Sequence, residues 1–140
     1  MRIALATFLG TITYFLFSWL VFEGLLGRFM AAHITALPGF RKAGDASSML
    51  FLFLSCVAYA LLLAVVFERW AHVRSFTDGI LLGALVGTLV ACMTDLYWYS
   101  TSTFFRSLLP VAADVAAAAL TVGLMGAVIG WYLGWAKGTA

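Results

Sequence analysis

The sequence predicts an all-α membrane protein, a polytopic four-helix bundle with up-down-up-down topology and a close antiparallel hairpin between the third and fourth helices. Three observations lead to this prediction. The 140 residues are 64% hydrophobic and only 10% charged, with a mean hydropathy of +1.06, and a soluble domain of this size cannot bury so much apolar surface. Four apolar segments are long enough to cross a bilayer, and small residues recur at every fourth position in the last two.

The four segments lie near residues 3–22, 49–67, 79–99 and 109–135. Each must be helical, because backbone groups that face lipid need hydrogen-bond partners within their own segment. We expect one domain over residues 1–140, since most connections are short. We also expect the first segment to be retained as a helix and not removed as a secretory signal, because no small-x-small cleavage site lies at the usual distance.

The loop at residues 23–48 is the one long connection. Its first part can continue the first helix or lie along the membrane interface, and Pro38 and Gly39 would then end it. The polar residues before the second and third segments are candidate helix caps: Asp45, Ser47 or Ser48 for the second, and Ser75 or Thr77 for the third.

Two ridges of mostly small residues run along the third and fourth segments, each on one side of its helix because every member is four residues from the next. They read Gly79, Gly83, Gly87, Ala91, Asp95 and Asp114, Ala118, Val122, Gly126, Gly130, Gly134. One antiparallel register pairs 79 with 130, 83 with 126, 87 with 122, 91 with 118 and 95 with 114. We therefore predict that the six glycines pack the two helices closely. The alternative is that glycine is simply common in membrane helices.

The same register brings Asp95 and Asp114 to equal depth. Charged groups inside membrane spans are costly and usually face the interior of a bundle, so the two aspartates are the leading candidates for a functional site. They could share a proton, or each could pair with Arg28 or Arg106, and Glu23 completes this predicted polar cluster. The alternative is that both lie near water, Asp114 favouring a helix N-terminus and Asp95 extending to the interface.

Polar side chains also form stripes on the first three segments. Six of them are candidate lining residues of a small-molecule pocket: Thr11, Tyr14, Ser18, Tyr59, Cys92 and Tyr99. The alternative is that these hydroxyls only form hydrogen bonds between helices.

Positive charges leave the orientation in the membrane open. We expect equal numbers on the two sides: Arg2, Arg69, Arg74 and Lys137 on one, and Arg28, Arg41, Lys42 and Arg106 on the other. The positive-inside rule therefore favours neither orientation.

Several classes of function lack support in the sequence. It contains no phosphate-binding glycine loop, nucleophile elbow or zinc-protease motif, so we predict no catalytic set, no metal site and no cofactor. A net charge of +2 is too small and dispersed for nucleic-acid binding. Cys56 and Cys92 could form a disulfide or serve as inert packing residues.

Short elements of the chain resemble two uncharacterised families of small bacterial membrane proteins, known as domains of unknown function with four predicted helices. The elements are Asp78-Gly79-Ile80-Leu81-Leu82-Gly83, Thr94-Asp95-Leu96 and Ala113-Asp114-Val115-Ala116, and Leu25-Leu26-Gly27-Arg28-Phe29-Met30 is similar to an L-F-G-K-x-W element of one family. The chain departs from the family pattern at Val21-Phe22 and Ala117-Ala118, where tryptophan-containing pairs are expected. The resemblance implies the fold and a bacterial inner membrane, and implies no activity.

Together these observations predict a non-enzymatic membrane protein, an accessory subunit or scaffold whose partners are the lipid bilayer and other membrane subunits or a second copy of itself. A carrier for small ligands, or one coupled to protons or cations through Asp95 and Asp114, is the alternative. A membrane enzyme that uses the two carboxyl groups as acid and base is the third hypothesis.

Overall fold

The computed structural model describes residues 1–36, 38–39 and 44–138, and every regular element among them is helical. The elements are α1 (Arg2–Trp19), a π-helical turn (Leu20–Leu25), α2 (Gly27–His33), α3 (Ala46–Val66), a second π-helical turn (Phe67–Ala71), α4 (Phe76–Thr101) and α5 (Leu108–Gly138). The predicted all-α bundle is confirmed.

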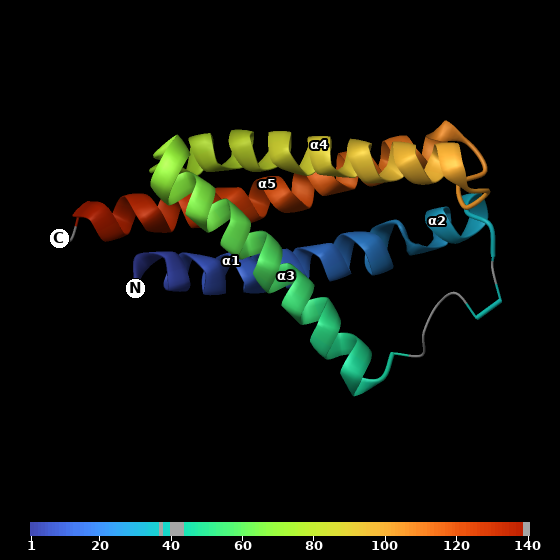
Figure 1. Cartoon of the computed structure of the whole chain (residues 1–140), viewed down its shortest axis with the longest axis horizontal. Coiled ribbons are helices and arrows are strands. Elements are labelled where there is room, and N and C mark those ends of the chain that lie inside the picture. The colour runs from blue at the N-terminus through green and yellow to red at the C-terminus, as the bar shows by residue number, and fades with distance from the viewer. Residues whose placement is uncertain (37, 40–43, 139–140) are drawn as a thin grey trace.

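The four long helices alternate in direction, and both chain termini lie at the same end of the bundle (Figure 1). α4 and α5 run side by side along most of their length, α1 lies against α5, and α3 crosses α1 at a steep angle (Figure 1). α5 is therefore the central helix, since both α4 and α1 pack on it. The predicted up-down-up-down topology is confirmed.

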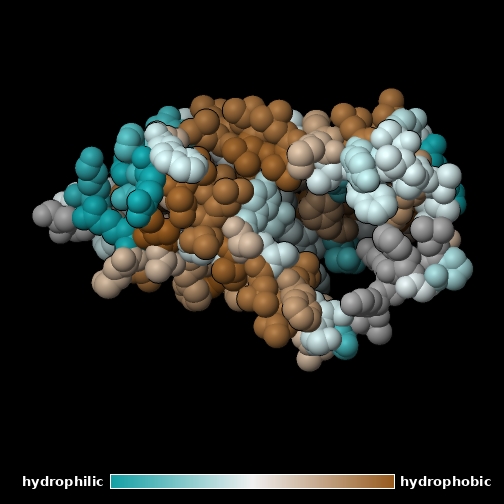
Figure 2. Space-filling view, viewed as in Figure 1, coloured by the Kyte–Doolittle hydropathy of each residue, from teal (hydrophilic) through white to brown (hydrophobic). Residues whose placement is uncertain are grey.

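Four helices are long and apolar enough to cross a membrane: residues 2–25, 46–71, 76–101 and 108–138, with mean hydropathies between 1.7 and 2.8. Figure 2 shows apolar side chains over the middle of the molecule and hydrophilic ones gathered towards both ends. The chain is accordingly a multi-pass membrane protein. The first helix runs on past residue 22 through the π-helical turn, so the connection to α3 is shorter than the predicted loop.

Side-chain caps explain where two of the spans begin. The Ser75 hydroxyl accepts a hydrogen bond from the Asp78 amide at 3.0 Å and donates one to the Asp78 carboxylate at 2.7 Å. At the start of α3, the Asp45 carboxylate accepts a hydrogen bond from the Ser48 amide at 2.9 Å. Of the candidate caps, Ser75 and Asp45 therefore take the N-cap position, where a side-chain acceptor satisfies an otherwise unpaired amide.

The close α4–α5 hairpin is confirmed, and glycines line the seam between the two helices. The buried residues of α4 are the five members of the predicted ridge, Gly79, Gly83, Gly87, Ala91 and Asp95. A Cβ atom on Gly83 would lie 2.5 Å from the carbonyl oxygen of Val122, and one on Gly87 would lie 2.6 Å from that of Ala118. Two backbones can approach this closely only where no side chain separates them.

The other glycines of the seam continue this contact towards the chain termini. Gly79 lies against Gly126, and Gly130 lies beside both Gly79 and Ser75. Gly134 contacts the backbone of Arg74, in the connection that precedes α4. Each α4 glycine thus fits between its partner in the predicted register and the next ridge residue one turn along α5, so the ridges interlock.

The apolar core lies between α1, the carboxyl-terminal half of α3 and α5. Its largest fully buried side chains include Leu63 and Phe67 from the second span and Met125, Ile129 and Leu133 from α5. Small residues also mark the crossing of α1 and α3: a Cβ atom on Gly10 would lie 3.4 Å from the Cβ atom of Ala60.

The amino-terminal half of α3 stands apart from this core. All seven residues from Met49 to Ser55 are exposed, and because successive helical residues point about 100° apart, they cover every side of the helix. The steep crossing in Figure 1 is the cause: α3 contacts α1 around Ala60 and then diverges from the bundle towards its amino-terminal end.

The seam leads to a first prediction. Gly83→Ala should lower the free energy of unfolding by about 1 to 3 kcal/mol, because the new methyl group meets backbone atoms that cannot move aside. Gly24→Ala is the matched control: its Cβ atom would lie 3.6 Å from a Leu20 methyl group, an ordinary contact, so the substitution should be neutral or stabilising. Unfolding in detergent micelles, followed by circular dichroism, measures both. Equal stabilities would contradict the close seam.

The cap of α3 leads to a second prediction. Hydrogen bonds from the Ser48 hydroxyl, the Ser48 amide and the Ser47 hydroxyl lower the pKa of Asp45 below its ordinary value. The ionised cap therefore stabilises the fold at neutral pH, and its contribution disappears as the pH falls through the lowered pKa. Asp45→Ala should reduce the melting temperature at pH 7 and reduce it less in acid, because only the wild-type carboxylate titrates. Asp45→Asn, which caps without a charge, should reduce the melting temperature at pH 7 less than Asp45→Ala does. A pH-independent effect of the alanine would refute this.

Candidate functional site

Asp95 and Asp114 face each other across the α4–α5 seam at its distal end, the end that lies away from the two chain termini (Figure 1). Asp95 is only 8% exposed, and Asp114 is partly buried. Their carboxyl groups are close enough to interact electrostatically. The Oδ2 atom of Asp95 is buried and receives no hydrogen bond from any described residue. The seam holds the pair together, because Asp95 is the carboxyl-terminal member of the α4 ridge and Asp114 is the amino-terminal member of the α5 ridge.

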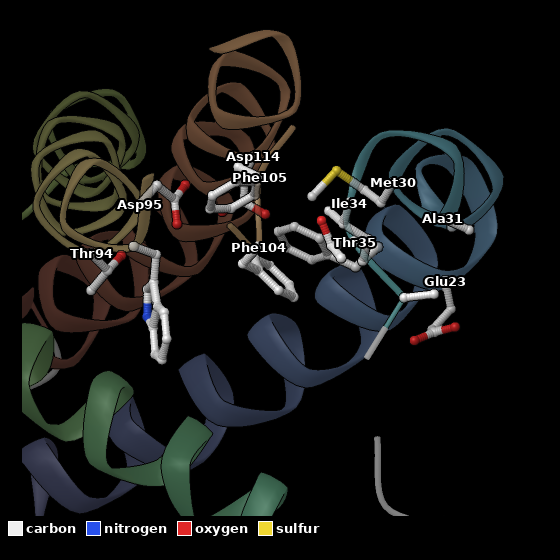
Figure 3. A pocket seen from close by; sticks show the side chains of 14 residues that line it. Glu23, Met30, Ala31, Ile34, Thr35, Thr94, Asp95, Phe104, Phe105 and Asp114 are labelled. Atoms are coloured by element: carbon white, nitrogen blue, oxygen red, sulfur yellow. The ribbon is translucent and has the colours of Figure 1, made fainter. Parts of the chain in front are cut away.

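Both carboxyl groups line a cavity of about 710 Å³. In Figure 3 the Asp95 side chain projects from α4 towards Asp114 and Phe105, while α2 and the residues after it form the opposite side. Besides the two aspartates, the lining residues come from the end of the first span, from α2 and the segment after it, from α4 and from the α4–α5 connection: Phe22, Glu23, Gly27, Met30, Ala31, Ile34, Thr35, Ala36, Thr94, Trp98, Phe104 and Phe105.

Backbone pairing between two connections encloses this side of the cavity. Ile34 and Phe105 form an antiparallel bridge. The Thr35 amide donates a hydrogen bond to the Phe104 carbonyl at 2.8 Å, and the Arg106 amide donates one to the His33 carbonyl at 3.2 Å. The segment after α2 is therefore tied to the α4–α5 connection, which carries the two phenylalanines into the cavity wall.

The sequence did not predict this pairing. Residues 23–48 were expected to form a long connection whose first part continues the first helix or lies along the interface, and the α4–α5 connection had no expected role. One feature of the sequence could have pointed to it: Phe104 and Phe105 are two large apolar residues in a connection outside the spans. Such a pair indicates that the connection packs against another part of the chain, but it does not identify which part.

The predicted ion pairs are wrong. Among the described residues, no ion pair joins either aspartate to Arg28 or Arg106. Arg28 is exposed, and an Nη1 atom of Arg106 lies 3.4 Å from the Ala32 carbonyl oxygen. Arg106 belongs to the α4–α5 connection, and its guanidinium group lies beside the end of α2. The sequence does not show this contact, because the two segments are far apart along the chain. Arg41 and Lys42 of the charge count lie outside the described residues.

Glu23 is an exposed residue that lines the same cavity on the side opposite the two aspartates (Figure 3). Asp114 is also close enough to the Tyr14 hydroxyl of α1 for the two groups to interact electrostatically. Of the predicted polar cluster, Asp95, Asp114 and Glu23 line the cavity, whereas Arg28 and Arg106 do not.

None of the six predicted pocket-lining residues lines this cavity. Thr11 donates a hydrogen bond to the Thr7 carbonyl of its own helix at 2.8 Å, and the rings of Tyr14 and Tyr59 pack edge to face at 5.5 Å. Cys92 and Tyr99 belong to α4, which packs on α5 through its glycine ridge and leaves Tyr99 39% exposed. The polar stripes do not converge, because α5 and not α1 covers α4.

The two cysteines are free, Cys56 buried on α3 and Cys92 partly buried on α4. These helices are not packing neighbours, so the predicted alternative of a disulfide is wrong.

The cavity offers two kinds of chemistry. Carboxyl groups this close in an apolar setting can hold a proton between them or bind a positive charge. Within the described part of the chain, no three His, Cys, Asp or Glu side chains come together as metal ligands. The surrounding aromatic and aliphatic side chains can hold an apolar body.

Comparisons with known protein families, with curated proteins and with solved structures find no match for this chain. The resemblance to the two bacterial families therefore stays a prediction.

The backbone pairing at the cavity leads to a third prediction. Thr35→Pro should be tolerated locally, because Ile34 already has the extended conformation that precedes proline (φ −103°, ψ 158°). The substitution removes the amide that bonds to Phe104, so hydrogen exchange should become faster at the Arg106 amide. Thr35→Ser keeps that amide and should leave exchange unchanged. The pairing would be disproved if proline did not alter exchange in residues 103–106.

Proposed function

We propose that this chain is a non-enzymatic membrane protein that binds other membrane helices, as an accessory subunit or scaffold. The observation that carries the proposal is the exposure of the amino-terminal half of α3, which diverges from the rest of the bundle. All seven residues from Met49 to Ser55 are exposed, and although the Phe53 ring meets Phe15 of α1 edge to face, this half of the span leaves most of its surface without contacts inside the bundle. Close packing between helices is a main source of stability within a membrane.

The composition of this half-helix supports a protein partner. Phe51 is 69% exposed, and its neighbours include Met49, Leu50 and Leu54. Aromatic side chains and methionine supply large contact areas and adaptable packing at protein interfaces. The connections outside the spans are small, so most of the surface available to a partner is the surface within the membrane.

We also propose the bacterial inner membrane as the location and the two uncharacterised families as relatives. Both proposals rest on the short motifs around Asp95 and Asp114 and on the four-span layout. A second candidate function is a small carrier coupled to protons or cations, which is favoured by the buried, adjacent carboxyl groups of Asp95 and Asp114.

Photo-crosslinking in native membranes tests the subunit role. Benzoylphenylalanine in place of Phe51 should give one discrete protein adduct, from a partner subunit or from a second copy. The matched control is the same side chain in place of Met93 on α4, which is 68% exposed and should give lipid adducts only. If both positions give only lipid adducts, α3 has no protein partner and the proposal fails.

A further inference from the structure

We propose that the cavity at the distal end of the bundle binds an organic monocation with an apolar body, its positive charge beside Asp95 and Asp114 and its apolar part against the aromatic wall. This inference concerns binding alone, and it depends neither on the proposed subunit role nor on transport.

The charge of the lining selects the sign of the ligand. Asp95 and Asp114 place two acidic side chains in the cavity wall, and none of the fourteen described lining residues is basic. No ion pair with a described residue neutralises either aspartate. In an environment of low dielectric constant, such a lining attracts a cation and repels an anion.

The Asp95 side chain gives this attraction a specific location. It is more than nine-tenths buried, it lines the cavity, and its Oδ2 atom receives no hydrogen bond from the described residues. A buried polar atom without a partner is costly. A cationic group beside this atom would offset that cost, so the site is complementary to a positive charge at a defined atom.

The rest of the lining is suited to the apolar part of the ligand. The Phe104 and Phe105 rings pack edge to face with centroids 4.9 Å apart, and the Trp98 ring lies 6.5 Å from Phe104. Met30 and Ile34 face these rings from α2 and the segment after it (Figure 3). Aromatic faces attract organic cations directly, so the wall adds to the effect of the carboxyl groups.

The size of the cavity excludes a bare ion as a sufficient occupant. A volume of about 710 Å³ lies within the range of small-molecule sites, about 300 to 1,000 Å³. A metal ion would leave most of this apolar volume unfilled, and two adjacent carboxyl groups are fewer ligands than cation sites in proteins usually supply.

Tetraphenylphosphonium and tetraphenylborate test the inference, because the two ions have nearly the same shape and opposite charge. Equilibrium dialysis against the purified full chain in detergent should show saturable binding of the cation and not of the anion. Asp95→Asn with Asp114→Asn should weaken cation binding about tenfold or more. The control Asp45→Asn removes one charge at the start of α3, outside the cavity, and should leave binding unchanged.

A measurement on the wild-type chain covers the case in which the double variant does not fold. Dicyclohexylcarbodiimide converts carboxyl groups in apolar sites to stable N-acylureas, which peptide mass spectrometry locates. Saturating tetraphenylphosphonium should slow the labelling of Asp95 and Asp114 at least threefold, and an equal concentration of tetraphenylborate should not. Unslowed labelling, equal binding of the two ions, or undiminished binding by a folded double variant would each overturn the inference. Binding without uptake of the cation into proteoliposomes would refute only the carrier.

Discussion

The close approach of α4 and α5 is the constraint on which the rest of this structure depends. Glycines bring the two backbones so near that an added methyl group at Gly83 or Gly87 would meet a carbonyl oxygen of the opposite helix. In lipid, where burial of apolar surface supplies little drive for association, such contacts provide dispersion energy over a long seam. The seam also sets one register, because ridges that interlock every four residues allow no small slip.

That register explains the position of the acidic pair. Asp95 and Asp114 end the two ridges, so the contact that aligns the glycines also brings the carboxyl groups together. A buried carboxyl pair is costly in an apolar environment. The close contacts along the seam can hold the pair in place despite this cost. Because both carboxyl groups line the adjoining cavity, we infer that the pair is kept for ligand binding.

The remaining helices contribute unequally. α1 and the carboxyl-terminal half of α3 complete the core around α5, whereas the amino-terminal half of α3 diverges from it. The segment after α2 closes the cavity through backbone hydrogen bonds to the α4–α5 connection. The protein thus combines a rigid hairpin with two peripheral elements. The amino-terminal half of α3 carries the proposed contact with a partner, and the segment after α2 closes the proposed ligand site on the hairpin.

Composition, helical periodicity and the spacing of glycines predict the membrane setting, the four helices, candidate caps for two of them and the α4–α5 register, because these features are local properties of the chain. The sequence also identified Asp95 and Asp114, since a charge inside an apolar span is conspicuous. The central position of α5, the divergence of α3 and the contact of Phe104 and Phe105 with the segment after α2 are visible only in the folded chain. The contacts between the segment after α2 and the α4–α5 connection join residues about 70 positions apart. They use backbone groups and side chains without a repeating pattern, which leave no periodic signal in the sequence.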